Sequence, residues 1–253
     1  MISRLYENDK YLNKDIEYIF GNEIIEYDLK SAGFNILCYF NLISDSMKNK
    51  LANMGKQERQ IQIGIMQKNN KEFAEKLSNG FKEARRLFFE ANNIGDLDIL
   101  SVKKDAIFTL KPCRNVRFGN LFFDTKNKYT SYLYLNRYEF LYNQDKIDIK
   151  GISDSNVELH NDGFLLFLKD YFMYKESMTN EYMRKFIIDF AKDYKEKELP
   201  IEFYRELNKN SLYKTNMVFN KHDIYLSDTT NMNVLDISYN YLNYIIPLTR
   251  LSI

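Results

Sequence analysis

The sequence predicts an α+β fold, and three observations support that prediction. An apolar, strand-like run occupies residues 22–29, a long helical stretch follows it, and short β-like runs return only after residue 97. Helical periodicity reappears after residue 160. Because a single strand must pair with something, we expect the first strand to join the later strands, so that the intervening helices are an excursion from one sheet.

The composition is that of a globular protein without a visible linker. Of 253 residues, 45% are hydrophobic and 28% are charged, and only 3 Pro and 9 Gly occur. The formal net charge of +1 excludes a chain that is strongly basic overall, although a local basic groove stays open. The Lys-, Asn-, Ile- and Tyr-heavy composition is associated with AT-rich genomes, such as those of some phages.

The few Cys and His residues restrict the chemistry. The two Cys suggest a reducing compartment, and two Cys with two His argue against a Cys/His zinc site. If the protein is an enzyme, carboxylates with a hard metal ion are therefore the more available catalytic groups. We see neither a signal peptide nor an apolar run long enough to span a bilayer. The expected location is cytoplasmic, meaning the host cytoplasm for a phage protein, with no membrane partner.

The elements follow in order along the chain. After the strand at 22–29, a helix is expected to begin with Ser31 as its N-cap. The clearest helix covers 69–92, where apolar residues recur at helical spacing. Strand-like runs fill 97–151. The predicted helices are 31–43, 45–66, 69–92, 164–175, 179–196 and 201–209.

Two isolated acids stand at predicted strand ends. Asp28 ends the first strand, and Asp105 lies in "SVKKDAIF", which suggests a tight hairpin although its centre lacks the Gly, Asn or Pro that short turns prefer. Such a turn can be retained for what its side chains do. An unbroken strand through Lys103 and Lys104 is an equally good interpretation of this stretch. If the acids are neighbours, they form a site for Mg²⁺ or Mn²⁺ with phosphate oxygens; taken singly, such acids usually belong to turns or caps.

Phosphate chemistry also requires cations, and the helical excursion carries several. Three of them share one face of the helix at 69–92 through i, i+3 and i+4 spacing. A basic helix face is more often a solvated surface than a binding site. The candidates are Lys56, Arg59, Lys82, Arg85 and Arg86.

The order of these features resembles the palm and fingers of a replicative DNA polymerase, family B most closely. "YDLKSAGFNI" resembles the first palm motif, an apolar strand ending in D-x-x-S before a helix, where Asp28 and Ser31 match. "SVKKDAIF" resembles the second palm motif, Tyr-Gly-Asp-Thr-Asp-Ser-Ile, where Asp105 falls on the second Asp and Lys103 replaces the first. The lysine motif of the family's fingers is not present.

This resemblance implies an architecture and two further contacts. It divides the chain into palm segments 1–44 and 97–159, a fingers-like insertion at 45–96 and a thumb-like helical region at 160–253. "KIDIKGI" resembles the family's segment that contacts the primer–template junction, and Lys150 and Gly151 match its Lys-Gly pair. The expected nucleic-acid-binding residues are Lys103, Lys104, Lys150 and Gly151. The expected nucleotide-binding residues are Ser31, Gly33, Lys56, Arg59, Lys82, Arg85 and Arg86.

Gly33 stands where family B polymerases have a Tyr that packs under the sugar and excludes a 2′-hydroxyl. The resemblance therefore implies that an active enzyme would accept ribonucleotides. Close packing between helix and sheet is an equally valid reason for a glycine at this position.

Three hypotheses remain open. The first is a compact template-directed nucleotidyltransferase that uses two-metal phosphoryl transfer on Asp28 and Asp105, with primer–template, nucleoside triphosphates and replication proteins as partners. The second is a catalytically inactive polymerase-like module that binds nucleic acid or a replication protein, which Lys103 beside the metal position favours. The third is an unrelated α+β interaction protein whose Tyr and Phe residues only fill a core.

Overall fold

The computed structural model describes most of the first 150 residues and parts of the remainder. The described residues are 2–135, 138–144, 147–150, 170–175, 177–196, 198, 217–219 and 224–226. The chain forms two compact units. The first comprises Met1–Ile16 and Asn22–Tyr129, and the second comprises Glu17–Gly21 and Thr130–Ile253. The division into palm, fingers and thumb segments stays a prediction.

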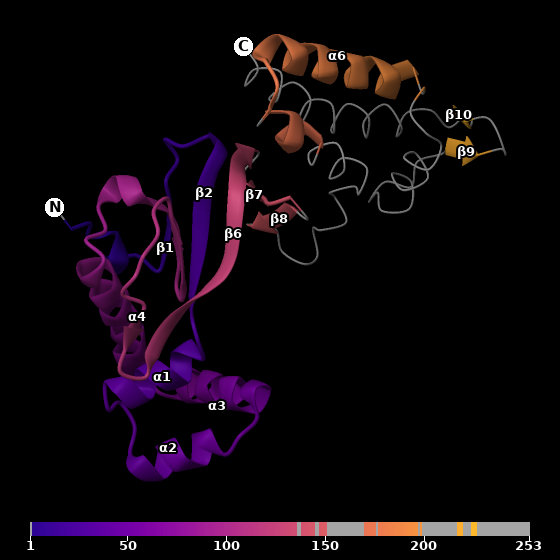
Figure 1. The fold of residues 1–253 in the computed structure, drawn as a ribbon. Coiled ribbons are helices and arrows are strands. Elements are labelled where there is room, and N and C mark those ends of the chain that lie inside the picture. The colour runs from indigo at the N-terminus through magenta and orange to yellow at the C-terminus, as the bar shows by residue number, and fades with distance from the viewer. Residues whose placement is uncertain are drawn as a thin grey trace. The chain divides into compact units, whose positions relative to one another are not determined.

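The first unit is built on an antiparallel sheet (Figure 1). In sequence order its strands are β1 (Lys10–Leu12), β2 (Tyr18–Leu29), β3 (Ile99–Lys103), β4 (Ala106–Thr109) and β6 (Leu121–Leu135). They lie in the spatial order β1-β3-β4-β2-β6, and β5 (Arg117–Phe118) pairs with β6. Both β2 and β6 also contribute residues to the second unit. Because β2 pairs with β4, the first predicted strand does join the later strands, and the helices between them are an excursion from one sheet.

Four helices make up the excursion. They are α1 (Ala32–Tyr39), α2 (Asp45–Ala52), α3 (Lys56–Asn69) and α4 (Lys71–Ala91). The single helix predicted at 45–66 is two helices, because the chain turns at 53–55 and Gly55 is the N-cap residue of α3. Side-chain oxygens of Ser44 and Asn70 cap α2 and α4 by accepting backbone N–H bonds.

Helix α4 covers one face of the sheet in the first unit (Figure 1). Its Phe88 ring lies 5.2 Å from that of Tyr27 on β2 and 4.6 Å from that of Phe123 on β6. Helix α1 crosses α4 at Gly80, where an added Cβ would overlap the Ile36 side chain, so only glycine permits this approach. These contacts fix the start of α1 directly after the end of β2.

The second unit contains the remaining strands and helices. Strands β6, β7 (Tyr138–Tyr142) and β8 (Ile147–Lys150) pair antiparallel, and the ring of Phe172 stacks on that of Tyr142 at 5.2 Å. Residues 170–175 are helical, as expected for the helix predicted at 164–175, and α6 (Asn180–Glu196) confirms the helix predicted at 179–196. Strands β9 (Met217–Phe219) and β10 (Ile224–Leu226) form a separate pair.

Part of what the sequence predicts for the C-terminal region lies beyond the described residues. The helix predicted at 201–209 and the residue Gly151 both lie outside the described residues. Within the part of the chain that the structure describes, no helix combines the length and apolarity needed to cross a bilayer.

Candidate functional site

The two acids singled out from the sequence lie at neighbouring strand ends. In the β2–β4 register Asp28 is opposite Ala106, the residue directly after Asp105. The backbone N–H of Leu29 donates to the Asp105 carbonyl at 2.9 Å. The strand ends that carry the two acids are therefore neighbours across the excursion, as predicted. Their role as metal ligands is a separate question.

Asp105 belongs to a tight hairpin turn. Strands β3 and β4 are joined by the two residues Lys104 and Asp105, which excludes an unbroken strand through this stretch. Lys104 has φ +46°, in the left-handed region where a side chain is disfavoured. This is the conformation for which short turns usually recruit Gly or Asn. The turn thus keeps a residue that is conformationally unfavourable for its backbone.

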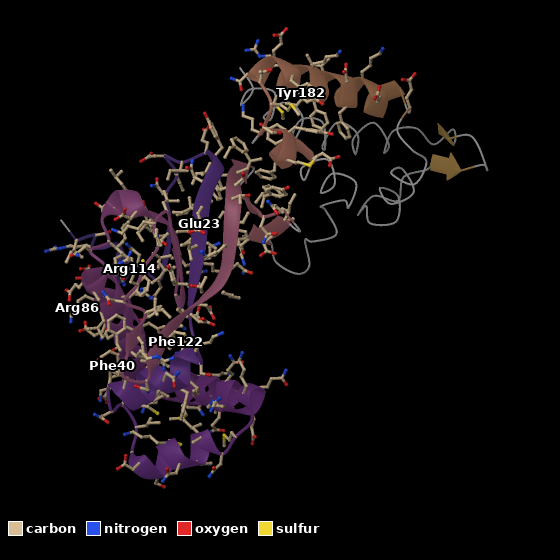
Figure 2. All side chains as sticks on the ribbon, viewed as in Figure 1. Glu23, Phe40, Arg86, Arg114, Phe122 and Tyr182 are labelled. Atoms are coloured by element: carbon tan, nitrogen blue, oxygen red, sulfur yellow. The ribbon has the colours of Figure 1, made fainter. Side chains whose placement is uncertain are left out.

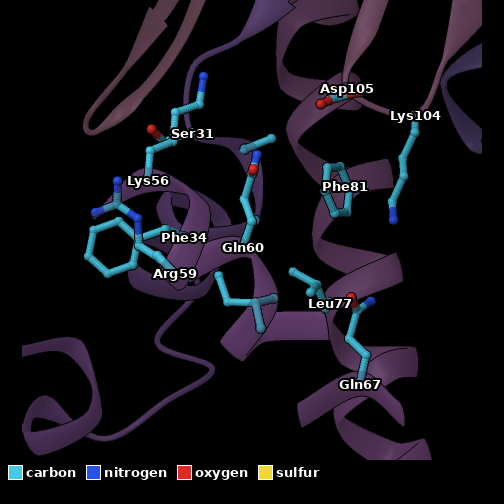
Figure 3. Close-up of a pocket in the computed structure, with 13 residues that line it drawn as sticks. Ser31, Phe34, Lys56, Arg59, Gln60, Gln67, Leu77, Phe81, Lys104 and Asp105 are labelled. Atoms are coloured by element: carbon cyan, nitrogen blue, oxygen red, sulfur yellow. The ribbon is translucent and has the colours of Figure 1, made fainter. Parts of the chain in front are cut away.

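A pocket of about 200 Å³ opens beside this turn (Figure 3). It is lined by α1, α3, α4 and the turn itself. Lys104 and Asp105 lie on one side of it, and Arg59 with Phe34 lies on the other. The pocket brings together six residues predicted from the sequence, which are Ser31, Gly33, Lys56, Arg59, Lys104 and Asp105.

Two of the three cations that line the pocket lie over aromatic rings. The Arg59 guanidinium lies 4.7 Å from the centroid of the Phe34 ring, and the Lys104 ammonium lies 4.7 Å from that of Phe81. Within the described residues, neither these two cations nor Lys56 forms an ion pair with a carboxylate. Their positive charge is therefore available to an anionic ligand.

Ser31 and Gly33 enter the pocket in ways that differ from expectation. Ser31 occupies the N-cap position of α1, but it has φ +45° and its side chain makes no capping bond, so its hydroxyl is not used to begin the helix. A Cβ added at Gly33 would lie 3.6 Å from the Cδ1 atom of Ile63 on α3. Gly33 therefore faces α3, and a ring at this position would meet the Ile63 side chain.

Asp28 lies in a crowded group of carboxylates. Its side chain is 27% exposed and it does not line the pocket. The Lys126 ammonium lies 4.0 Å from Asp28 and 3.5 Å from the almost fully buried Glu26, which also accepts hydrogen bonds from Asn127 at 2.6 Å and Tyr129 at 3.1 Å. Burial raises the pKa of the Asp28 carboxyl, Lys126 opposes that rise, and Asp105 and Glu26 add to it.

These acids satisfy only the minimum requirement for a magnesium site. Among the described residues, no group of three or more His, Cys, Asp or Glu side chains could hold a metal ion. Magnesium is commonly bound by one or two carboxylates, with water and substrate phosphates completing its shell. Asp28 and Asp105 are two such carboxylates, and of these only Asp105 lines the pocket.

The basic residues predicted on α4 are placed elsewhere. Arg85 is buried and bonded within the protein core, and Arg86 lies on the outer side of the helix between Glu83 and Glu90 (Figure 2). Neither of them lines the pocket, and nor does Lys82. Sequence reasoning missed the lining residues Gln60, Gln67 and Phe81, since polar and apolar helix positions carry no signal of a pocket.

The residues expected to contact nucleic acid are scattered. Lys103 ends β3 with its ammonium 5.1 Å from the centroid of the Phe108 ring, while Lys104 lines the pocket. Lys150 ends β8 in the second unit, in register with Glu139.

Comparison with known proteins places the chain in a phage family. A family model described as "Bacteriophage PBS1 gene 130 protein" matches residues 1–253. The chain belongs to this family. The expected phage origin agrees with that result, and the family's description names no activity. No curated protein matches the chain.

Proposed function

We propose that this PBS1 gene 130 family protein is a compact, template-directed nucleotidyltransferase with a palm-like sheet. The observation that supports this most is the arrangement around the β3–β4 turn. Asp105 lies beside Asp28 and at the same time lines a pocket that carries the cations Lys56, Arg59 and Lys104. The fold thus brings two acids close to cations suited to bind phosphate, although these residues are far apart in the sequence.

In this proposal the pocket binds the phosphates of a nucleoside triphosphate. Lys104, Lys56 and Arg59 neutralise the negative charge that develops on the departing pyrophosphate. Asp28 and Asp105 would hold Mg²⁺ or Mn²⁺, which activates the attacking hydroxyl when it is bound. Primer–template nucleic acid, nucleoside triphosphates and replication proteins would be the partners, in the host cytoplasm.

The test is incorporation of a labelled nucleotide on a primed template in the presence of Mg²⁺. Asp28→Asn and Asp105→Asn should each abolish incorporation without loss of the fold, because a metal ligand acts mainly on the transition state. Asp124→Asn is the matched control, since Asp124 is a carboxylate on β6 that pairs with Lys30 at 2.8 Å. Normal incorporation by either the Asp28 or the Asp105 variant would refute the catalytic assignment.

A second candidate function is a polymerase-like module that binds nucleic acid without catalysis. It is favoured by the position of Lys126, whose ammonium lies 4.0 Å from Asp28 and competes with a metal ion for that carboxylate. Such a module would bind DNA with an affinity that falls as salt is added, yet incorporate nothing. Measurement of binding and incorporation on the same template separates the two functions.

A further inference from the structure

Arg85 is a buried cation that donates hydrogen bonds to oxygen atoms of three residues. Its side chain is 1% exposed. It donates to the carbonyl of Tyr6 at 2.8 Å, to the carbonyl of Lys104 at 2.5 Å and to the Asp9 carboxylate at 2.9 Å. Removing a guanidinium from water is unfavourable unless fixed partners compensate it. A geometric role therefore explains Arg85 better than a gain in stability alone.

The partners of Arg85 surround the strained turn. The N–H of Lys104 donates to the Asp9 carbonyl at 2.7 Å, while the Lys104 carbonyl accepts from Arg85. Both sides of this residue are thus tied to one pair, Asp9 and Arg85. A left-handed residue other than glycine persists only where its surroundings enforce that conformation.

Helix α4 also directs the side chain of the turn. Phe81 lies four residues before Arg85, so both belong to the same side of the helix. The Lys104 ammonium lies over the Phe81 ring, and both residues line the pocket. One helix therefore holds the backbone of Lys104 through Arg85 and its ammonium through Phe81.

We infer that Arg85 is a positioning residue, which holds the Lys104–Asp105 turn in the conformation that presents both side chains to the pocket. The inference rests on the proposed function only in taking a polyphosphate as the pocket's ligand. Arg86, the next residue along α4, is bonded to Glu83 and Glu90 on the outer side and supplies a matched control.

The first experiment is a double-mutant cycle read by calorimetric titration with inorganic tripolyphosphate. Arg85→Lys keeps the charge but loses the planar fork of donors, so we expect affinity to fall about tenfold, while Arg86→Lys leaves it unchanged. In a Lys104→Ala background, Arg85→Lys should cause no further loss, because its effect acts through Lys104. An equal loss in both backgrounds would overturn the inference.

The second experiment needs no ligand. Amide hydrogen exchange of Lys104 and Leu29 reports the two backbone bonds that hold the turn, Lys104 N–H to Asp9 and Leu29 N–H to Asp105. Both amides should exchange about tenfold faster in Arg85→Lys and at the wild-type rate in Arg86→Lys. Unchanged exchange in the Arg85 variant would overturn the inference.

These two measurements separate failure of the inference from failure of the proposed function. If the wild type does not bind tripolyphosphate, the proposed function fails, and exchange at the turn still decides the role of Arg85. If Arg85→Lys does not fold, Asp9→Asn replaces it, because the Asp9 carboxylate is 46% exposed and removing its charge weakens the clamp from the solvent side. Faster exchange at Lys104 in that variant is then the expected result, and wild-type exchange contradicts it.

Discussion

Lys104 offers a test in which stability and binding should separate. Lys104→Ala and Lys104→Gly both remove the ammonium from the pocket and from the Phe81 ring, so those losses are the same in the two variants. They differ in backbone preference, because residue 104 has φ +46°. The left-handed conformation costs roughly 1–2 kcal/mol for a residue with a Cβ and nothing for glycine.

Part of that advantage is offset by the greater freedom of glycine in the unfolded chain, which is worth about 0.4–1 kcal/mol. The glycine variant should therefore be more stable than the alanine variant by about 1 kcal/mol, or roughly 2–4 °C in Tm for a chain of this size. Both variants should bind tripolyphosphate about tenfold more weakly than the wild type, as expected when one charged contact is lost.

Thermal unfolding followed by circular dichroism gives the stability order, and calorimetric titration gives the affinities. Wild-type affinity in either variant would show that Lys104 has no part in binding. A glycine variant less stable than the alanine variant would refute the argument from backbone strain. The combined expectation, a better turn with poorer binding, is what a residue retained for its side chain should show.

Three further outcomes are expected. Burial raises the pKa of Asp28 in the folded protein above its ordinary value of 3.8. Asp28 therefore adds to the free energy of unfolding below pH 3.8, and this contribution is lost as the pH rises through the folded pKa. Asp28→Asn should thus unfold at a higher temperature than the wild type near pH 7, but not below pH 3.8. Gly33→Tyr should lower Tm because the ring meets Ile63, and in any folded, active protein it should raise the kcat/KM preference for deoxyribonucleotides; a strong preference in the wild type would contradict the open sugar site. Lys150→Ala should weaken DNA binding for all sequences alike and reduce the salt slope by about one, which titrations at several salt concentrations measure; an unchanged slope would remove Lys150 from the interface.

The sequence was sufficient to predict that the strand ends carrying Asp28 and Asp105 are neighbours. A buried strand cannot leave its backbone groups unpaired, and only the strands after residue 97 were available as partners. The hairpin at Lys104 was also predictable, although its unusual turn residues left a continuous strand equally open. Strand pairing was predictable because it follows from backbone hydrogen bonding, which does not depend on the identity of the side chains.

Helix orientation was harder to predict. Spacing alone placed Lys82, Arg85 and Arg86 on one face, yet adjacent residues on a helix point about 100° apart. The structure buries Arg85 and leaves Arg86 half-buried, paired with Glu83 and Glu90. A usable signal was present, since Phe81 and Phe89 lie four residues before and after Arg85 and mark the buried side. The pocket itself was not predictable, because it depends on how α1, α3 and α4 pack together.

Lys126 is the residue through which the two candidate functions can be told apart. Its ammonium lies 4.0 Å from Asp28 and its side chain is 50% exposed, so solvent screens the attraction, which is about 1 kcal/mol at this distance in water. In the proposed metal site a divalent ion would carry twice the charge and would also gain Asp105 as a ligand, so Lys126 would not prevent its binding. In a nucleotidyltransferase, Lys126→Met should therefore strengthen the binding of Mn²⁺ by removing a competitor. In a module that binds nucleic acid without a metal, the same change should leave Mn²⁺ binding absent and weaken DNA binding, because a cation is lost. Titration of the variant with Mn²⁺ separates the two functions, and titration with DNA tests the role of Lys126 in the binding module. Identical behaviour of variant and wild type in both titrations would remove Lys126 from both functions.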